Sequence, residues 1–410
     1  MKYNKTIWII NQYASHLTTR HEELSRVFAA AGYRVAVITS SFHHGSRKYI
    51  YDEPLVCKEL CSGVSYFYLH SGPSYSTNGA GRILNMVDFC RLVEKYRGKI
   101  AQHTGAPGFI IASSASPFVW ETGYRTAKKY GAKFIAELRD IWPLSLVEIQ
   151  GVSPGHPFVR LLGIIEKRAY NRAAAVVATL PYAWKHITAV TNVPREKVYW
   201  MPNGINTQTT DEQRSRTQAL PEPLNSYLSS HWCCVYIGSF VKSECLDFMV
   251  DAIGPLQEED ICFAIIGHGH EEDNIRTRIN EKGYKNIKIF PYIDKSLIPA
   301  VLEKAGCCVA AHDNIGIYRY GLSMNKLSDY LYSGKPVVFA YSGESVVKEA
   351  GGFAVPHDEG QAMAETIKRI KGMDEAALKQ IAASERETIL RRYDYKAIGT
   401  AYLEMLEGLQ

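Results

Sequence analysis

Short apolar runs alternate with helical patterns along the whole chain, and this alternation limits the fold more than any other feature. The runs expected to form strands in the first half are Ile7–Ile10, Arg34–Thr39, Phe109–Ala112, Lys133–Ala136 and Ala175–Ala178. Those in the second half are Cys234–Ile237, Ile261–Ile266, Ile287–Phe290, Cys307–Ala311 and Val337–Ala340. Strands that are separated by helices pair in parallel. The sequence therefore predicts an α/β fold built on parallel sheets rather than a β-sandwich.

A change of composition near residue 206 divides the chain. Val198–Asn206 has the pattern of a strand that leads into a turn, and Thr207–Ser230 is polar, irregular and proline-bearing, as a linker would be. A chain of 410 residues is long enough for two or three domains with full cores. We therefore expect two Rossmann-like domains, at residues 1–205 and 206–391.

Composition excludes several classes of protein. The chain has no run of about 18 uncharged apolar residues, which a transmembrane helix would need. Its first residues, Met1–Gln12, fit a β-strand better than a signal peptide. None of the nine cysteines is spaced as a paired zinc ligand. These features predict a reduced, cytoplasmic protein.

The net charge of +5 is unevenly distributed. Residues 1–205 contain 25 Lys and Arg against 13 Asp and Glu, a net +12, whereas the remainder contains 22 against 29, a net −7. A basic first half could contact an anionic membrane surface, a phosphate-bearing acceptor or nucleic acid. We expect no nucleic acid, because the chain has no zinc finger, RNA-recognition motif or basic repeat. A solvated charge bias without a partner is the alternative.

The segment Gly321–Ala340 has the pattern of a loop, a helix, a glycine stop and a buried strand. Asn325 and Lys326 fall near the helix start, where free backbone N–H groups and the helix dipole favour an anion such as phosphate. Asp329 lies one turn further on and could accept hydrogen bonds from ribose hydroxyls. The alternative is a capped αβ unit without a ligand.

This segment resembles the signature of GT-B glycosyltransferases of family 4, in which an acidic residue precedes a short helix and Gly-x-Pro-Val. In that family the acidic residue holds the ribose of a nucleotide sugar, and Asp329 matches it. A second Glu, usual eight residues earlier, is replaced here by Gly321. The pattern Ser-x-Asn-Lys-x-x-Asp-Tyr-x-x-x-Gly-Lys-Pro is similar to a branch acting on bacterial surface polysaccharides and lipid-linked sugars, which includes fucosamine-transferase-like enzymes. The resemblance covers most of the chain. It implies two sheets that face each other across a cleft, with residues 392–410 returning to the first domain.

The resemblance assigns a donor-binding loop to the end of the strand at Gly238. Backbone amides in such a loop and helix start suit a diphosphate. The family usually carries Gly-Arg-Leu-x-x-x-Lys-Gly here, but Ser239 stands at the Arg position and Glu244 at the Lys position. The cation for the leaving diphosphate would then be Lys242 or Lys326. Without a ligand, the segment would be a plain strand–helix turn.

Further donor-binding residues follow from the same resemblance. Gly267 and Gly269 match the Gly-x-Gly turn that the family places beside the donor. Tyr292 and Ile293 follow the next strand, where related enzymes hold the base. Leu327, in the helix start after Lys326, completes the predicted donor-binding set.

Two segments of the first half could contact the sugar or the acceptor. Arg139 and Asp140 follow a strand and either form a buried structural ion pair or act as catalytic residues on the sugar. Their context, Arg-Asp-x-Trp-Pro, matches the same family branch. The polar loop after the first strand supplies Tyr13, Arg20 and His21, which either meet the ligand or lie on the surface of a first helical turn.

The amphipathic segment His156–Arg172 could lie in a bilayer interface beside a lipid-linked acceptor, although such a helix more often belongs to a domain core. The aromatic and basic loop Phe42–Tyr51 is a second segment that could contact an acceptor or a membrane. If either does so, the cytoplasmic protein would be peripheral at the inner face of the plasma membrane.

Together these residues and the resemblance imply a hexosyl- or N-acetylhexosaminyltransferase. It would move a sugar from a nucleotide diphosphate donor, a UDP-sugar, to a lipid-linked or saccharide acceptor, with retention and without metal or cofactor. Two alternatives remain. One is a non-catalytic GT-B partner protein, because the family's Arg, Lys and first Glu are replaced. The other is a sugar-nucleotide epimerase, whose Gly-Thr-Arg-Pro-type motif is absent from Asn11–Thr19.

Overall fold

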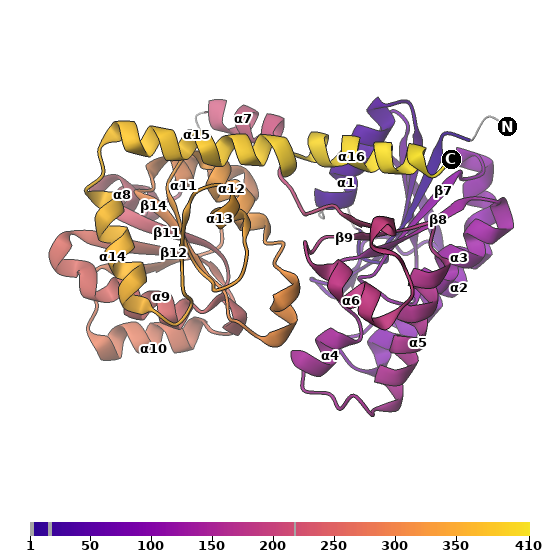
Figure 1. The fold of residues 1–410 in the computed structure, drawn as a ribbon, viewed down its shortest axis with the longest axis horizontal. Helices are drawn as coiled ribbons and strands as arrows, with labels where there is room; N and C mark the ends of the chain where they lie inside the picture. The colour runs from indigo at the N-terminus through magenta and orange to yellow at the C-terminus, as the bar shows by residue number, and fades with distance from the viewer. Residues whose placement is uncertain (1–3, 15–18, 217–218) are drawn as a thin grey trace. The chain divides into compact units, whose positions relative to one another are not determined.

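The computed structural model describes residues 4–14, 19–216 and 219–410. The chain forms two compact units (Figure 1). Unit 1 runs to Asn203 and includes Tyr395–Gln410, and unit 2 is Gly204–Asp394. These boundaries differ by two and three residues from those expected at 205 and 392.

In its described part, unit 1 contains an eight-stranded sheet in the order β10-β9-β8-β7-β1-β2-β6-β5. All neighbouring strands are parallel except β5, which pairs antiparallel with β6 at one edge. The chain order reverses between β1 and β7, and ligands bind outside the carboxyl ends of strands at such a switch point. The strands are β1 (Thr6–Ile10), β2 (Arg34–Ser40), β5 (Leu55–Cys61), β6 (Val64–Leu69), β7 (Phe109–Ser113), β8 (Lys133–Leu138), β9 (Ala175–Ala178) and β10 (Val198–Trp200).

Helices cover this sheet, and the C-terminal helix α16 packs on α1. The rings of Phe28 and Tyr402 lie 5.5 Å apart, and Gly399 allows close approach, because a Cβ there would lie 2.6 Å from Val27. The helices are α1 (Thr19–Ala30), α2 (Ala80–Thr104), α3 (Val119–Tyr130), α4 (Leu144–Glu148), α5 (Pro157–Arg172), α6 (Ala183–Val190), η1 (Arg195–Lys197) and α16 (Tyr395–Gly408). A small hairpin joins β3 (Phe42–His43) to β4 (Lys48–Tyr49).

In its described part, unit 2 has a six-stranded, fully parallel sheet in the order β13-β12-β11-β14-β15-β16. Counted within the unit this is the order 3-2-1-4-5-6 of a Rossmann fold, with its switch point between β11 and β14. The strands are β11 (Trp232–Ser239), β12 (Ile261–His268), β13 (Ile287–Phe290), β14 (Cys307–Ala311), β15 (Val337–Ala340) and β16 (Phe353–Val355).

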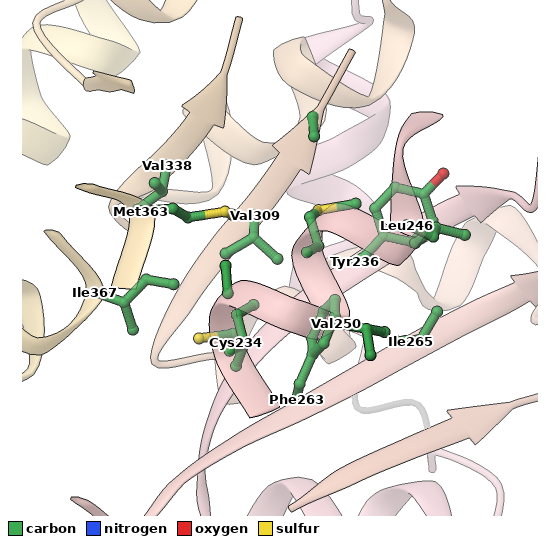
Figure 2. Close-up of a cluster of buried hydrophobic side chains, with 14 of the residues drawn as sticks. Cys234, Tyr236, Leu246, Val250, Phe263, Ile265, Val309, Val338, Met363 and Ile367 are labelled. Carbon is green, nitrogen blue, oxygen red and sulfur yellow. The ribbon is translucent and has the colours of Figure 1, made fainter. Parts of the chain in front are cut away.

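The core of unit 2 lies between this sheet and the helices α9 and α14, as Figure 2 shows. Val250 and Ile367 come from the two helices, and Phe263, Val309 and Val338 come from three strands. The helices are α7 (Thr207–Ser215), α8 (Leu224–Ser230), η2 (Lys242–Glu244), α9 (Leu246–Ile253), η3 (Gly254–Glu259), α10 (Glu272–Lys282), η4 (Lys295–Leu297), α11 (Ile298–Lys304), η5 (Gly316–Tyr320), α12 (Asn325–Ser333), α13 (Val346–Glu349), α14 (Gly360–Lys371) and α15 (Glu375–Arg392).

The prediction of an irregular linker at Thr207–Ser230 is wrong. This segment forms α7 and α8, which belong to unit 2. Asn206 caps α7 by accepting a hydrogen bond from the Thr209 backbone N–H at 3.0 Å, and the Tyr332 hydroxyl donates to Asp211 at 2.7 Å. Because α7 buries no residue, its stability rests on capping and side-chain hydrogen bonds, which a hydrophobic pattern does not show.

The cysteines of the sheet act as small apolar residues, as their place in apolar runs indicates. All nine cysteines are free. Cys234 and Cys307 lie in register on β11 and β14, fully buried, with 3.5 Å between their Sγ atoms. No helix in the described ranges is both long and apolar enough to cross a bilayer.

Candidate functional site

Close backbone packing shapes the carboxyl end of the sheet in unit 2. Gly267, with φ +148°, is the last residue but one of β12 and lies against the carbonyl oxygen of Gly238, and a Cβ at Gly267 would overlap that oxygen. A Cβ at Gly269 would likewise overlap the carbonyl of Phe240. Only glycine fits at these two positions, so the two loops approach each other with backbone groups alone. A ligand that follows these loops would therefore meet peptide groups rather than side chains.

Lys326 lies at the centre of this site. Its Nζ donates to Glu244 Oε2 at 2.6 Å and to the Tyr236 hydroxyl at 2.9 Å, and it lies 4.3 Å from the centre of the Tyr236 ring. Gly238 makes room for the ammonium group, because a Cβ there would be 2.6 Å from Nζ. Burial lowers the pKa of Lys326, and the Glu244 carboxylate opposes that shift. The chain therefore holds a desolvated cation at the end of β11.

Lys242, the other cation expected at the diphosphate, lies elsewhere. It is exposed and lines a cavity of about 330 Å³ together with Asp247, Glu271 and Arg278. Ser239 is also exposed. Of the two cations, Lys326 is therefore the one that the structure places beside Gly238.

The start of α12 is open, as the sequence predicts. Its cap residue, Met324, makes no side-chain hydrogen bond to the first turn, and Asn325 is exposed. Leu327 does not fit a donor-binding role. Its side chain is 2% exposed, and its backbone N–H donates to the Met324 carbonyl at 3.3 Å. Leu327 therefore anchors the helix in the core, while the neighbouring residues remain available to an anion.

Asp329 lies one turn along the same helix and is half-buried. Desolvation raises the pKa of its carboxyl to about 6, and Lys295 only partly offsets the shift. Within the described ranges, no donor forms a hydrogen bond or ion pair with this carboxyl. A desolvated carboxylate without donors is costly, so hydroxyl groups of a ligand would relieve that cost.

The backbone conformation at Gly321 explains why the glutamate of the family signature is absent at this position. Gly321 adopts φ +89° and ψ 177°, a region open essentially to glycine alone. A glutamate could not replace it without rebuilding the turn between η5 and α12.

An exposed aromatic side chain follows β13. Tyr292 is 65% exposed, and its ring stands perpendicular to that of His268, with 5.7 Å between their centres. Ile293 is only 6% exposed, so it could offer a ligand its backbone groups but not its side chain. The Tyr292 ring is thus free to stack on a planar group.

In unit 1, Arg20 and His21 do not face a ligand, which corrects their predicted role, and they are not surface residues either. Both are almost fully buried and converge on Glu137, which is 0% exposed. Arg20 donates to Glu137 from Nε and Nη2 at 3.1 and 2.9 Å, and from Nη1 to the Pro202 carbonyl at 2.6 Å. His21 Nε2 lies 2.7 Å from Glu137, and its Nδ1 lies 2.9 Å from the amide nitrogen of Asn11.

The protonation states of this cluster follow from its geometry. Burial alone would raise the pKa of Glu137, but Arg20 and His21 hold it well below its usual range. Burial lowers the pKa of His21 against the pull of Glu137, so a neutral ring donates from Nε2 and accepts at Nδ1. All these polar groups are used within the cluster, which therefore has a structural role.

Arg139 and Asp140 leave β8 at its carboxyl end, as predicted, but no ion pair joins them in the described part of the chain. The Arg139 backbone N–H donates to Ser114 Oγ at 2.9 Å, whereas the Asp140 side chain is exposed. Despite that exposure, partial desolvation raises the pKa of Asp140, and Arg139 and Arg82 oppose the shift. The alternative of a buried structural pair is therefore wrong, and both side chains could contact a ligand.

The loop after β1 is described only in part, because residues 15–18 lie outside the described ranges. Tyr13 is half-buried, and its hydroxyl accepts a hydrogen bond from Arg82 Nε at 3.3 Å. No group of three or more His, Cys, Asp or Glu side chains in the described ranges is arranged to hold a metal ion.

The helix α5 belongs to the core of unit 1 on one face and is apolar and exposed on another. Val159 and Leu162 are buried, whereas Leu161 and Ile164 are 47% and 50% exposed. The prediction that this helix belongs to a domain core is thus confirmed. The apolar side chains of Leu161 and Ile164 nevertheless remain exposed to solvent.

Two residues of the site were missed by sequence reasoning. The sequence indicates Glu244 only as a departure from the family pattern and gives no sign of Tyr236, yet both bind Lys326. The acidic residue at a position where the family has a lysine was the available signal, since a reversed charge requires a partner.

Comparisons with known proteins identify the family and the fold. The family model described as Glycosyltransferase Family 4 matches residues 18–209, and the model described as glycosyl transferases group 1 matches residues 233–371. A putative colanic acid biosynthesis glycosyl transferase, WcaI of Escherichia coli K12, is 22% identical over 234 residues. That match spans 55% of this chain and 55% of that relative.

Two solved structures share the fold over nearly the whole chain. HepE of Anabaena, in complex with UDP-glucose, has a TM-score of 0.62 at 14% identity and covers 98% of this chain and 99% of its own. A UDP-forming trehalose-phosphate synthase of Burkholderia xenovorans has a TM-score of 0.72 at 12% identity and covers 99% of both chains.

Proposed function

The chain belongs to the GT4-type GT-B glycosyltransferases, and from this premise we propose that it transfers a sugar from a UDP-sugar to a lipid-linked or saccharide acceptor, with retention. The observation that carries the proposal is α12. Its open first turn, the desolvated Lys326 and the unpartnered Asp329 lie within a helical turn of one another at the switch point of unit 2.

The ribose, the base and the diphosphate of a UDP-sugar each have a binding partner in this site. The ionised Asp329 would accept hydrogen bonds from the ribose hydroxyls, and the exposed Tyr292 ring would stack on the base. Lys326 and the backbone amides at Gly238 and Asn325 would surround the diphosphate. As the bond to the sugar breaks, negative charge grows on the diphosphate, and these fixed dipoles and the ammonium group would stabilise it.

We expect donor binding without a metal or cofactor, because Lys326 and the amides of α12 would neutralise the diphosphate. In unit 1, Arg139 and Asp140 would contact the sugar or the acceptor from the end of β8. A hexose or an N-acetylhexosamine would suit this polar pair.

We also propose that unit 1 contacts an anionic membrane surface. Leu161 and Ile164 are exposed on α5, and Arg160, Lys167 and Arg168 are exposed on the same helix. Apolar side chains flanked by basic ones bind the interface of anionic bilayers. The protein should co-sediment with phosphatidylglycerol vesicles and not with phosphatidylcholine vesicles. Replacing Leu161 and Ile164 with serine should reduce the bound fraction several-fold, and unchanged binding would disprove the contact.

Glu244 should weaken donor binding in the native protein. It neutralises Lys326 and would repel a diphosphate that takes its place. Glu244→Gln should therefore bind UDP several-fold more tightly and be less stable, because Lys326 loses its partner. Calorimetric titration of UDP and thermal unfolding measure the two effects.

The matched control is Glu272→Gln, which removes the ion pair between Glu272 and Arg276 on the surface of α10. Weaker UDP binding by Glu244→Gln would show that Glu244 positions Lys326 productively.

A panel of nucleotides tests the proposed function. The melting temperature of the purified protein should rise with UDP and UDP-sugars, with or without EDTA, and not with GDP or ADP. A response to GDP or ADP alone would reassign the base. No response to any nucleotide would favour the non-catalytic partner protein.

A further inference from the structure

A cluster of aromatic rings and arginines covers the carboxyl ends of β1, β2 and β6 in unit 1. Tyr13 follows β1, and His44 and Arg47 lie in the hairpin that follows β2. Tyr75 follows β6, and Arg82 lies in the first turn of α2. Because β1, β2 and β6 are neighbours in the sheet, these five residues meet at one edge, next to the switch point. We call them the aromatic–arginine cluster.

The members of this cluster are in direct contact. His44 Nδ1 lies 2.7 Å from the Tyr75 hydroxyl and 2.9 Å from Arg47 Nη1. Arg47 lies over the Tyr75 ring at 5.0 Å, and Arg82 lies over the Tyr13 ring at 5.7 Å. The Tyr13 and His44 rings are 5.0 Å apart. The hydrogen bonds and ring contacts therefore fix both guanidinium groups in place.

The charge of this cluster is not balanced by its neighbours. Within the described ranges, neither Arg47 nor Arg82 has a carboxylate oxygen within 4 Å, whereas Arg91, on the same helix as Arg82, pairs with Asp88. The third polar member of the cluster, His44, cannot balance the two arginines, because a histidine side chain carries no negative charge. Burial and the two arginines lower the pKa of His44 to about 4, so its ring is neutral at physiological pH. Two half-buried cations thus share one site without a counterion.

The hydrogen-bonding groups suit a phosphate. Guanidinium groups bind phosphate through paired N–H donors, and the Tyr13 hydroxyl, which accepts from Arg82, still has its own O–H to donate. The electrostatic influence of Arg82 reaches Asp140, so the cluster lies near the residues assigned to the acceptor side. Next to Arg82 on α2, Leu84 and Val87 are 57% and 49% exposed, and their spacing of three places them on one helix face.

We propose that Arg47 and Arg82 bind a phosphate group of the acceptor, with Tyr13 orienting it and the buried Tyr75 ring holding Arg47 in place. This inference rests on the proposed function, because only a glycosyltransferase has an acceptor. The residues of the phosphate site belong to unit 1, whereas those of the donor site belong to unit 2. The phosphate could belong to a soluble sugar phosphate or to a lipid-linked diphosphate, and the exposed pair Leu84 and Val87 would contact only the lipid.

Binding of inorganic diphosphate to the full chain tests the site. Calorimetric titration is carried out with excess UDP, so that the donor site is already filled. Arg47→Gln and Arg82→Gln should each weaken diphosphate binding about tenfold, which is the loss of one charged hydrogen-bonded contact. Arg82→Lys keeps the charge but loses the paired donors, so it should give a smaller loss. The matched control is Arg91→Gln on the same helix, which should bind diphosphate as the native protein does.

The same variants separate this proposal from the donor proposal. UDP binding should be unchanged in Arg47→Gln and Arg82→Gln, and this also shows that both proteins are folded. If the native protein binds no diphosphate beside UDP, or if all three cluster variants bind it normally, the proposal is wrong. Failure of UDP binding alone would contradict the proposed function and leave the phosphate site standing.

A second titration identifies the source of the phosphate. Farnesyl diphosphate should bind at least tenfold more tightly than inorganic diphosphate if the acceptor is lipid-linked, and replacing Leu84 and Val87 with serine should remove that gain. Equal binding of the two probes, with both lost in Arg82→Gln, would assign the site to a soluble sugar phosphate.

Discussion

Asp329→Asn should lose UDP binding and at the same time make the protein more stable at neutral pH. The ionised carboxylate would accept two hydroxyl hydrogen bonds, and charge-assisted bonds contribute about 1.5–3 kcal/mol each. The amide keeps only part of that acceptor strength, so UDP affinity should fall about 100-fold. Titration calorimetry of UDP at pH 7.5 measures this loss. The exposed Asp273→Asn on α10 is the control and should bind UDP normally.

The gain in stability follows from the same desolvation. The pKa of Asp329 is about 6 in the folded protein, against 3.8 for an ordinary aspartate. The native protein therefore loses stability as pH rises from about 4 to 6, since the folded state holds a proton that the unfolded state has released. Above pH 6 the loss is complete, at about 3 kcal/mol. The variant should be more stable than the native protein at pH 7.5 and equal to it at pH 4. A variant that is destabilised at pH 7.5 would contradict this account of the site.

Glu385→Gln should flatten the pH dependence of stability. Glu385 is 0% exposed on α15, and neither carboxyl oxygen accepts a hydrogen bond of normal geometry. Desolvation raises its pKa to about 8, although the Val337 backbone amide opposes the shift. An ordinary glutamate titrates near 4.5. Stability should therefore fall between about pH 4.5 and pH 8, by roughly 5 kcal/mol in all.

Urea unfolding at half-unit steps from pH 5 to pH 9 measures that slope. Glutamine does not titrate, so Glu385→Gln should remove most of the dependence of the unfolding free energy on pH. The buried amide changes the stability itself only by an amount that is the same at every pH. Glu387→Gln, an exposed neighbour on α15, should retain the pH dependence. If the slope of Glu385→Gln equals that of the native protein, the Glu385 carboxyl is not the group that titrates.

The fold could be predicted from sequence because the strands of both sheets are buried on two faces. Runs such as Cys307–Ala311 and Ala175–Ala178 are then apolar throughout, and the structure places them within a residue or two of the expected ends. The antiparallel edge strand β5 is only half-buried and alternates irregularly, so it gave no such signal. The helix α7 was missed for a related reason, because it has no buried face at all.

Sequence predicted the site only for residues that share one helix or loop, because their relative positions follow from their spacing along the chain. Lys326 and Asp329 share one helix, so their relative placement follows from its period. Glu244 and Arg20 are fixed by contacts far along the chain, Glu244 with Lys326 and Arg20 with Glu137, and spacing alone does not encode such contacts. For the same reason the burial of His21 could not be read from its neighbours in sequence.

The central claim is that this chain transfers sugar from a nucleotide diphosphate donor. Its most direct test is the release of UDP from UDP-glucose and UDP-N-acetylglucosamine by the purified protein, with bacterial membrane lipids as acceptor and EDTA present. We predict turnover with one of the two donors that depends on the lipid extract and is lost in Asp329→Asn. Tight UDP binding without any UDP release from either donor would contradict the claim and identify a non-catalytic partner protein.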